Sequence, residues 1–217
     1  MLLDALGPSE REAVTSCLRP RRHRAGQVLF NDGDVGDCMH LVNSGRLSVH
    51  STTPDGVTVT LRVVHPGEFF GELALVHSAH RRTGRVVALE ASETSVLSRS
   101  DFESLRQTQP AIDRLLVAAL AERLVRTSEL VTELMMPPEQ RVWRRLAVLA
   151  EAYGSEPVRM SQEELARAAG TVRQTVNRAL RHAEVAGIVE LQRGSVRVVD
   201  PAALTLLATR SAGGSLR

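Results

Sequence analysis

One short stretch of this 217-residue chain has side chains whose types and spacing suit the binding of a phosphorylated sugar. It reads Phe70-Gly-Glu-Leu-Ala-Leu75 and is followed by Arg81-Arg-Thr-Gly84. A Gly-Glu turn before a short helical segment presents backbone N–H groups to an anion, and Arg82 adds a cation with bidentate geometry. Glu72 can accept a hydrogen bond from a sugar hydroxyl. Taken singly, Glu72 and Arg82 would more often form a surface ion pair, but together with the turn they predict a nucleotide pocket.

A second group of side chains suits the reading of base edges in duplex DNA. Arg173, Gln174, Asn177 and Arg178 fall on the early, outward turns of a predicted helix. Arg can donate to guanine O6 and N7, and Gln or Asn can pair with adenine N6 and N7. On an arbitrary helix these residues would be a solvated face. They follow a predicted capped helix and a glycine turn, however, which favours recognition of DNA.

The capped helix begins at Ser161-Gln-Glu-Glu164, a capping box, and Gly170 supplies the turn before the next helix. Thr171-Val-Arg-Gln174 can also be read as a capping box, in which Gln174 would serve its own helix rather than a base.

The elements that must position these two groups differ between the halves of the chain. Residues 27–98 form short alternating runs of strand composition, separated by Gly- and Asp-containing turns, which predicts an antiparallel sandwich or jelly roll. Apolar residues then recur at spacings of three, four or seven across 110–135 and predict one long amphipathic helix, whose length favours pairing with its copy in a dimer. They are Ile112, Leu116, Leu120, Leu124, Val131 and Leu134.

Pro137 and Pro138 end the long helix and mark a domain boundary. Beyond them, three helical segments (139–153, 161–169 and about 172–186) and two short strands (188–191 and 196–199) predict a winged helix-turn-helix. We therefore predict an α+β protein with a β domain over 1–109, a dimerisation helix over 110–136 and a DNA-binding domain over 137–217.

Composition and charge limit the possible functions. The basic residues exceed the acidic ones only in the C-terminal part: 15 Arg against 17 Asp and Glu up to Met136, and 12 against 8 from Pro137 on. A polyanion is thus expected to meet the C-terminal part. Cys17 and Cys38 are too isolated for a disulfide framework, a thiolate metal site or an iron–sulfur cluster, so two free thiols are expected. No activated nucleophile, metal triad or acid–base pair appears, which argues against an enzyme.

The run from Gly67 to Leu75 and through Arg82-Thr-Gly84 resembles the phosphate-binding cassette of the cyclic AMP receptor protein and FNR (CRP/FNR) superfamily, and the similarity extends from about Ala25 to Val199. The resemblance implies that Gly71, Glu72 and Leu73 hold the ribose and phosphate edge, and that Arg82 and Thr83 hold the cyclic phosphate. On the long helix, Thr127 and Ser128 match the pair that contacts adenine from both subunits, and Arg123 lies one turn earlier. Two small hydroxyl side chains are unusual in the apolar seam of a helix pair, which favours a binding role for Thr127 and Ser128. The alternative is that they form a polar part of the seam that sets the register of the two helices.

The resemblance also implies a DNA-contacting set around the second helix of the helix-turn-helix. That set is Ser161, Gln162, Thr171, Arg173, Gln174, Thr175, Asn177 and Arg178. Gln174 stands where the family usually has Glu, which accepts from cytosine N4, so the family's half-site is not expected to transfer unchanged. Val172 replaces a frequent hydroxyl residue, and Gly84 replaces a small Ala of the cassette.

The expectation from the sequence is a homodimeric transcription regulator that binds cyclic AMP as an allosteric ligand, a palindromic DNA site and RNA polymerase. No cofactor or metal is expected. No apolar run is long enough to span a bilayer and the N-terminus lacks secretion features, so we expect no membrane and a cytoplasmic location.

Three alternatives stay open: a ligand-independent or differently liganded regulator, a haem sensor using His77 or His80, and a nucleotide-binding module that acts by protein contact. We assign no function to the Gly- and Ser-rich residues 211–217.

Overall fold

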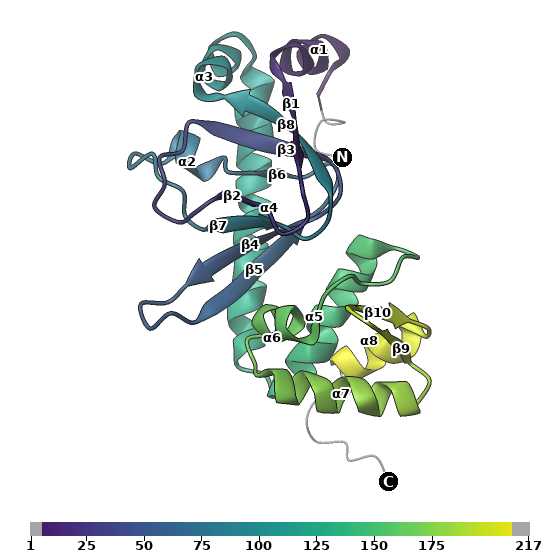
Figure 1. Ribbon diagram of the computed structural model, residues 1–217. Coiled ribbons are helices and arrows are strands. Elements are labelled where there is room, and N and C mark those ends of the chain that lie inside the picture. Colours follow the sequence, from purple (N-terminus) through teal and green to yellow (C-terminus); the bar gives the residue numbers. More distant parts are fainter. Residues whose placement is uncertain (1–5, 210–217) are drawn as a thin grey trace. The chain divides into compact units, whose positions relative to one another are not determined.

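The computed structural model describes residues 6–209 of the chain (Figure 1). The expected tail 211–217 lies outside this range. Internal contacts divide the described residues into two compact units, one up to Asp55 with Leu61–Ser128, the other Gly56–Thr60 with the residues from Glu129 on. The division falls within the long helix, whereas the predicted domains were separated at 109 and 136; those ranges remain predictions.

The first unit contains two four-stranded sheets of antiparallel pairs, in the orders β1-β8-β3-β6 and β2-β7-β4-β5. The strands are β1 (Arg19–His23), β2 (Val28–Phe30), β3 (Cys38–Ser44), β4 (Leu47–Thr52), β5 (Thr58–Val64), β6 (Phe69–Phe70), β7 (Arg85–Ala88) and β8 (Ser92–Ser98). Side chains from both sheets form one core, with Val42, Leu47, Val64 and Phe70 almost fully buried. The predicted antiparallel sandwich is confirmed.

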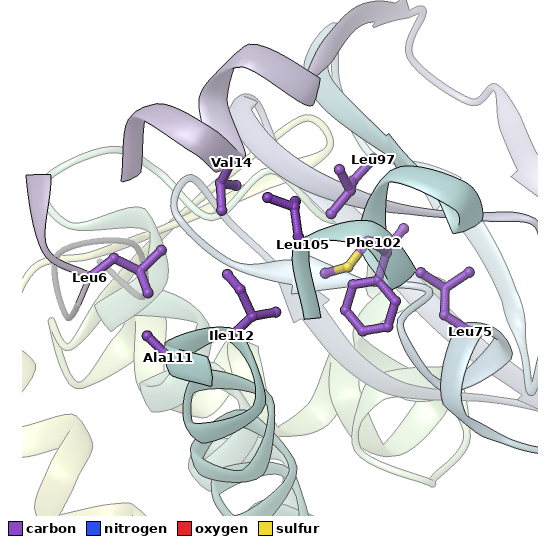
Figure 2. Packing of buried hydrophobic residues seen from close by; sticks show 9 residues of the cluster. Leu6, Val14, Leu75, Leu97, Phe102, Leu105, Ala111 and Ile112 are labelled. Atoms are coloured by element: carbon purple, nitrogen blue, oxygen red, sulfur yellow. The ribbon is translucent and has the colours of Figure 1, made fainter. Parts of the chain in front are cut away.

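A second apolar cluster joins the helices of this unit to the sheets. The helices are α1 (Pro8–Cys17), α2 (Leu73–Val76), α3 (Arg99–Thr108) and the start of α4 (Pro110–Leu134). Figure 2 shows Leu75 of α2, Phe102 and Leu105 of α3 and Ile112 of α4 gathered in this cluster. Burial of each such side chain contributes about 1.5–3 kcal/mol. The cassette helix α2 therefore shares a core with the helices that follow the β domain.

The long helix α4 spans 25 residues and changes character along its length. Ile112 is buried in the second cluster, whereas Val117, Leu124 and Val131 are 65%, 68% and 61% exposed. These three residues recur at intervals of seven, so they lie along one face of the helix.

The second unit holds the remaining helices and a two-stranded wing: α5 (Pro138–Tyr153), α6 (Gln162–Ala168), α7 (Arg173–Val185), α8 (Pro201–Thr209), β9 (Val189–Gln192) and β10 (Ser195–Val198). Val142, Leu146, Leu165, Val176 and Leu180 are at most 1% exposed and form its interior. Its helices and wing follow the order expected of a winged helix-turn-helix.

Candidate nucleotide pocket and DNA-binding surface

Arg82 is the most constrained side chain of the cassette. Its Nη1 donates to the carbonyl oxygens of Cys38 at 2.7 Å and Gly71 at 3.1 Å, and its Nη2 donates to Cys38 Sγ at 3.2 Å. Its guanidinium carbon lies 4.1 Å from the centre of the Phe30 ring. Only 5% of Arg82 is exposed, yet its Nε is buried without an acceptor in the described structure. The guanidinium is thus held rigidly and still has a donor to offer to an anion.

Two glycines allow this close packing around Arg82. Gly71 has φ +84°, and a Cβ there would lie 2.6 Å from Arg82 Nη1. A Cβ on Gly36 would lie 2.2 Å from the Ala74 Cβ and 3.1 Å from Arg82 Nε. Any larger residue at either position would displace the guanidinium or the cassette.

Glu72 lies beside the pocket as a buried, half-satisfied carboxylate. Glu72 is 6% exposed, and its Oε1 accepts a hydrogen bond from Arg123 Nη1 of α4. Its Oε2 is buried with no donor in the described structure. Because an unsatisfied buried charge is costly, this oxygen is a fitting acceptor for a ligand hydroxyl.

The cassette residues surround a narrow pocket that is partly open to solvent. Gly71, Leu73, Arg82, Thr83 and Arg123 line it, as predicted for a shared site, and so do Phe30, Val49, Arg62, Phe70, Ala74, Gly84 and Val86. Arg62 was not singled out from the sequence. It lies in the alternating run of β5, where a polar residue is expected to face solvent.

The presence of glycine at position 84 has a steric explanation. A Cβ at this position would come 2.7 Å from the carbonyl oxygen of His50 on β4. The alanine that is usual in the family would therefore press against backbone here, so glycine suits the packing of β4 and β7.

Arg99, another residue not identified from the sequence, ties the cassette to α3. Its Nη2 donates to the carbonyl oxygens of Gly36 at 2.6 Å and Ala74 at 2.8 Å, and its Nη1 donates to that of Leu75 at 3.3 Å. Because Arg99 is the first residue of α3, a shift of α2 would be transmitted to that helix.

Thr127 and Ser128 do not line the pocket of a single chain. Both are exposed on α4, where their hydroxyls donate to the carbonyl oxygens of Arg123 at 2.8 Å and Leu124 at 3.0 Å. Their predicted contact with a base from both subunits remains a prediction.

The helix-turn-helix has the local geometry predicted from the sequence. Ser161 Oγ accepts from the Glu164 N–H at 3.2 Å, and Glu164 Oε2 accepts from the Ser161 N–H at 2.6 Å, so the capping box of α6 is formed. Gly170 turns the chain with φ +57°. On α7, Val176, Ala179 and Leu180 face inward and are fully buried.

The outward face of α7 carries the predicted base-reading residues. Arg173, Gln174, Asn177 and Arg178 are exposed, and Thr175 is half-buried. Asn177 Nδ2 donates to Gln162 Oε1 of α6 at 3.1 Å, which brings the two helices' polar groups together. Ser161, at the start of α6, is exposed, and Thr171, between the two helices, is half-buried.

The second capping box read from the sequence was wrong. The N-cap of α7 is Val172, which has no side chain that could cap, and not Thr171. The physical reason is that Thr171 belongs to the preceding turn, where its N–H donates to the Ala166 carbonyl at 3.0 Å. Gln174 therefore does not form a capping box for α7, and its side chain is exposed.

The wing adds a cation that the sequence reasoning did not select. Arg193 is exposed at the turn between β9 and β10, next to Gly194 with φ +77°. Val158 and Val196 exchange backbone hydrogen bonds of 2.8 and 2.9 Å, which attach the wing to the segment before α6. An arginine flanked by a turn glycine between two strands is the signal that could have identified it.

The described residues contain neither a candidate metal site nor a candidate membrane span. Within 6–209, no group of three or more His, Cys, Asp or Glu side chains could hold a metal ion. In the same range, no helix is long and apolar enough to cross a membrane. Cys17 and Cys38 are free thiols, as expected.

Comparison with known proteins supports both the nucleotide pocket and the DNA-binding surface. The family model of the cyclic nucleotide-binding domain matches residues 20–109, and that of the Crp-like helix-turn-helix domain matches residues 140–207. The cyclic AMP receptor protein of Thermus thermophilus is 34% identical over 95% of this chain and 96% of its own length. The crystal structure of the Thermus thermophilus catabolite activator protein is 33% identical, with a TM-score of 0.56 over 95% of this chain and 97% of that one.

A third relative shares the fold at lower identity. The c-di-GMP-responsive global regulator CLP of Xanthomonas campestris has a TM-score of 0.75 and 24% identity, over 88% of this chain and 99% of that one.

The fold and the two sites define a cyclic-nucleotide-binding, DNA-binding transcription regulator, a class that is not enzymatic. The chain belongs to the CRP/FNR superfamily.

Proposed function

We propose that this protein is a homodimeric transcription regulator whose sequence-specific binding to DNA responds to cyclic AMP. The observation that carries the proposal is a pair of unpartnered buried atoms: Nε of Arg82, which lines the pocket, and Oε2 of Glu72, which does not line it but stands between the lining residues Gly71 and Leu73. A cyclic phosphate accepts from the first and a ribose hydroxyl donates to the second, so one nucleoside cyclic phosphate satisfies both. A relative that is 34% identical is named a cyclic AMP receptor protein, which favours adenine as the base.

The exposed face of α4 supports dimerisation. Val117, Leu124 and Val131 present apolar side chains at heptad intervals on a helix of 25 residues. Burial of this face against a second copy is favourable, because each side chain leaves water. Thr127 and Ser128 lie between Leu124 and Val131, so they would meet the nucleotide base near the seam of the pair.

A dimer presents two copies of α7 to DNA. Two recognition helices one turn of DNA apart enter successive major grooves of a palindromic site, and RNA polymerase is the expected protein partner at such a site. A cytoplasmic location is part of the same proposal. Gln174 can pair with adenine N6 and N7, so the half-site should differ from that of relatives with Glu at this position.

The nucleotide acts by favouring the conformation that binds DNA. It can shift that equilibrium only by its differential affinity for the two conformations. Arg123 of α4 binds Glu72 of the cassette, and Arg99 of α3 binds the carbonyls of α2, so occupancy of the pocket bears directly on both helices.

A different effector in the same fold is the second candidate. The relative from Xanthomonas campestris is a c-di-GMP-responsive regulator at 24% identity, so pockets on this fold need not take a cyclic mononucleotide. A regulator without a ligand and a module that acts only by protein contact are further alternatives. A haem sensor would use His77 or His80; Nδ1 of His77 accepts from the Ala79 N–H at 3.2 Å and Nδ1 of His80 lies 2.9 Å from Arg99 Nη1, so Nε2 of either ring would be the atom that binds iron.

The test is calorimetric titration of the purified full-length chain with cyclic AMP and, in parallel, cyclic GMP. Light scattering gives the oligomeric state, and selection from a random duplex pool, with and without nucleotide, gives the operator. Saturable binding that increases affinity for a palindrome supports the proposal. DNA binding that is the same with either nucleotide or with none would overturn the cyclic AMP response, and absence of salt-dependent DNA binding would favour the protein-contact module.

A further inference from the structure

Arg62 is a third arginine of the nucleotide pocket, and the phosphate and ribose groups do not account for it. It lines the pocket from β5, and its Nη2 donates to the Phe69 carbonyl at 2.9 Å. Its Nε is buried and has no acceptor in the described structure. Burial lowers the pKa of Arg62, which reflects the cost of taking this cation out of water. A buried donor without an acceptor is an unusual feature and suits a ligand that supplies one.

The charged neighbours of Arg62 come from both the cassette and α4. After burial, the groups that act on its pKa are Glu72, Arg123, Glu68 and Arg126, in that order. Arg123 and Arg126 belong to α4 and bind Glu72 and Glu68, the latter at 3.1 Å. Arg82, the predicted phosphate ligand, is instead held by the Cys38 and Gly71 carbonyls.

The chemistry of a nucleoside cyclic phosphate then decides what Arg62 meets. In such a ligand the phosphate closes a ring on the 3′ and 5′ oxygens, and the base leaves the ribose at the 1′ carbon on the other side. With the phosphate at Arg82 and the ribose at Glu72, the base lies toward α4 and Arg62. Arg62, which lines the pocket together with Arg123 of α4, would then lie within reach of the base.

We propose that Arg62 determines base selectivity and makes the pocket accept a 6-oxopurine cyclic nucleotide in addition to cyclic AMP. A guanidinium has only donors. Guanine and hypoxanthine offer two acceptors, O6 and N7, which match it, whereas adenine offers N7 beside a donating N6 amino group. The inference rests on the proposed function, because it requires a cyclic nucleotide in this pocket.

The experiment uses three nucleotides on the full-length chain: cyclic AMP, cyclic GMP and cyclic IMP. Cyclic IMP carries the 6-oxo group without the 2-amino group of guanine, so it isolates the atom that Arg62 should recognise. Each affinity is measured by calorimetry for the wild type, for Arg62→Gln and for Arg126→Gln. Arg126→Gln is the matched control, because it removes the same charge from a neighbouring arginine that does not line the pocket.

The expected result is that Arg62→Gln loses affinity selectively for the 6-oxopurine nucleotides. Arg62→Gln should weaken the binding of cyclic GMP and cyclic IMP about tenfold more than that of cyclic AMP, since a bidentate arginine–base contact discriminates between bases by about 1–3 kcal/mol. Arg126→Gln should change all three affinities alike. If Arg62→Gln fails to fold, Arg62→Lys keeps the charge without the planar fork and should show a smaller loss in the same direction.

Two results would overturn the inference and leave the proposed function intact: cyclic AMP binding with no measurable binding of either 6-oxopurine nucleotide to the wild type, or equal losses for all three nucleotides in Arg62→Gln. Failure of all three nucleotides to bind the wild type would overturn the proposed function itself, and this inference with it.

Discussion

The two sites of this chain use arginine in opposite ways. In the pocket, Arg82 is 5% exposed and held by backbone carbonyls, and it keeps one buried donor without a partner. On α7, Arg173 and Arg178 are exposed, with Val176, Ala179 and Leu180 as the buried face behind them. The pocket has already desolvated and oriented its binding groups during folding, whereas the helix keeps its groups in water until DNA arrives.

This difference has a consequence for mutations. A change at a buried residue of the pocket should alter stability and ligand affinity together, because the same atoms serve both. A change on the outer face of α7 should alter DNA affinity alone.

Replacement of Arg82 by alanine should have the largest effect. The variant loses the cation for the phosphate and leaves two buried carbonyls without their donor, so we expect at least about 100-fold weaker cyclic AMP binding and a loss of roughly 1–3 kcal/mol in stability per unpaired group. Calorimetry and urea unfolding measure the two effects, and the nucleotide's influence on DNA binding should disappear.

Arg81→Ala is the control for Arg82→Ala. Arg81 is exposed and donates to the Gly33 carbonyl at 2.8 Å, so its loss should leave nucleotide affinity nearly unchanged. An Arg82→Ala variant that retains a full response to the nucleotide would remove Arg82 from the site.

Replacement of Arg173 by alanine should weaken binding to the selected operator by about 1–3 kcal/mol and relax specificity at one base pair. Nucleotide affinity and stability should stay close to wild type, because Arg173 is exposed at the first turn of α7. Fluorescence anisotropy with operator and scrambled duplexes measures the effect. Arg181→Ala is the matched control on the same helix, since Arg181 is engaged with Glu184 at 2.9 Å; equal losses in both variants would mean that Arg173 acts as a general cation only.

The sequence predicted the elements with strong periodicity. The long run from Ile112 to Leu134 became α4, and the alternating runs became six of the strands, because their apolar residues recur at the helix or strand period. It missed β6, since Phe69 and Phe70 give too few residues for a period, and β1, whose five residues include three arginines and no apolar alternation. It also missed the short helices α1, α3 and α8. The capping of α6 was read correctly from Ser161 and Glu164, because that motif is local.

The pocket residues were predicted from one contiguous motif and, for Arg123 of α4, from the family resemblance. Gly71, Arg82 and Thr83 were found because they lie within one run of sequence, whereas Arg62 and Phe30 reach the pocket from distant strands. In the sequence, Arg62 follows Thr58 and Thr60 as the polar member of an alternating run, so it reads as a solvent-facing residue; in the structure the same face of β5 carries the buried Thr60 and Val64. The roles of Thr127 and Ser128 depend on a second chain, so they stay predictions.

Acid should destabilise the first unit through a buried histidine. The pKa of His40 is lowered to about 3, mainly by burial and then by Arg82, and the ring stacks on Phe70 at 4.8 Å. Because its folded pKa lies below the unfolded value of 6.5, the stability linked to neutral His40 is present above pH 6.5 and is lost as pH falls toward 3. The expected loss between pH 7 and pH 5 is about 2 kcal/mol.

The pH effect is measured by urea unfolding at the two pH values. Circular dichroism follows the secondary structure of both units, and fluorescence follows Trp143, the single tryptophan of the chain, which is buried in the second unit. A transition seen by circular dichroism but not by Trp143 fluorescence belongs to the first unit, and only that transition should shift with pH. In His40→Gln the difference between pH 7 and pH 5 should shrink; an unchanged difference would assign the acid lability to other groups, such as His23, whose pKa is also lowered by burial.

The smallest effect concerns Gly84, where the chain departs from the alanine usual in its family. A Cβ would lie 2.7 Å from the His50 carbonyl oxygen, and that carbonyl cannot retreat easily because His50 pairs with Arg85 across β4 and β7. Overpacking of this kind costs about 1–3 kcal/mol, and the reduced freedom of the unfolded chain offsets about 0.4–1 kcal/mol of it. Gly84→Ala should therefore lower the stability of the first unit by roughly 1 kcal/mol. Thr83→Ala is the companion variant: Thr83 is exposed at the pocket, so its loss should reduce nucleotide affinity with little change in stability. If Gly84→Ala proved as stable as the wild type, the backbone around Arg82 would be more adaptable than its packing indicates, and the contrast between a preformed pocket and a solvated DNA-binding face would weaken accordingly.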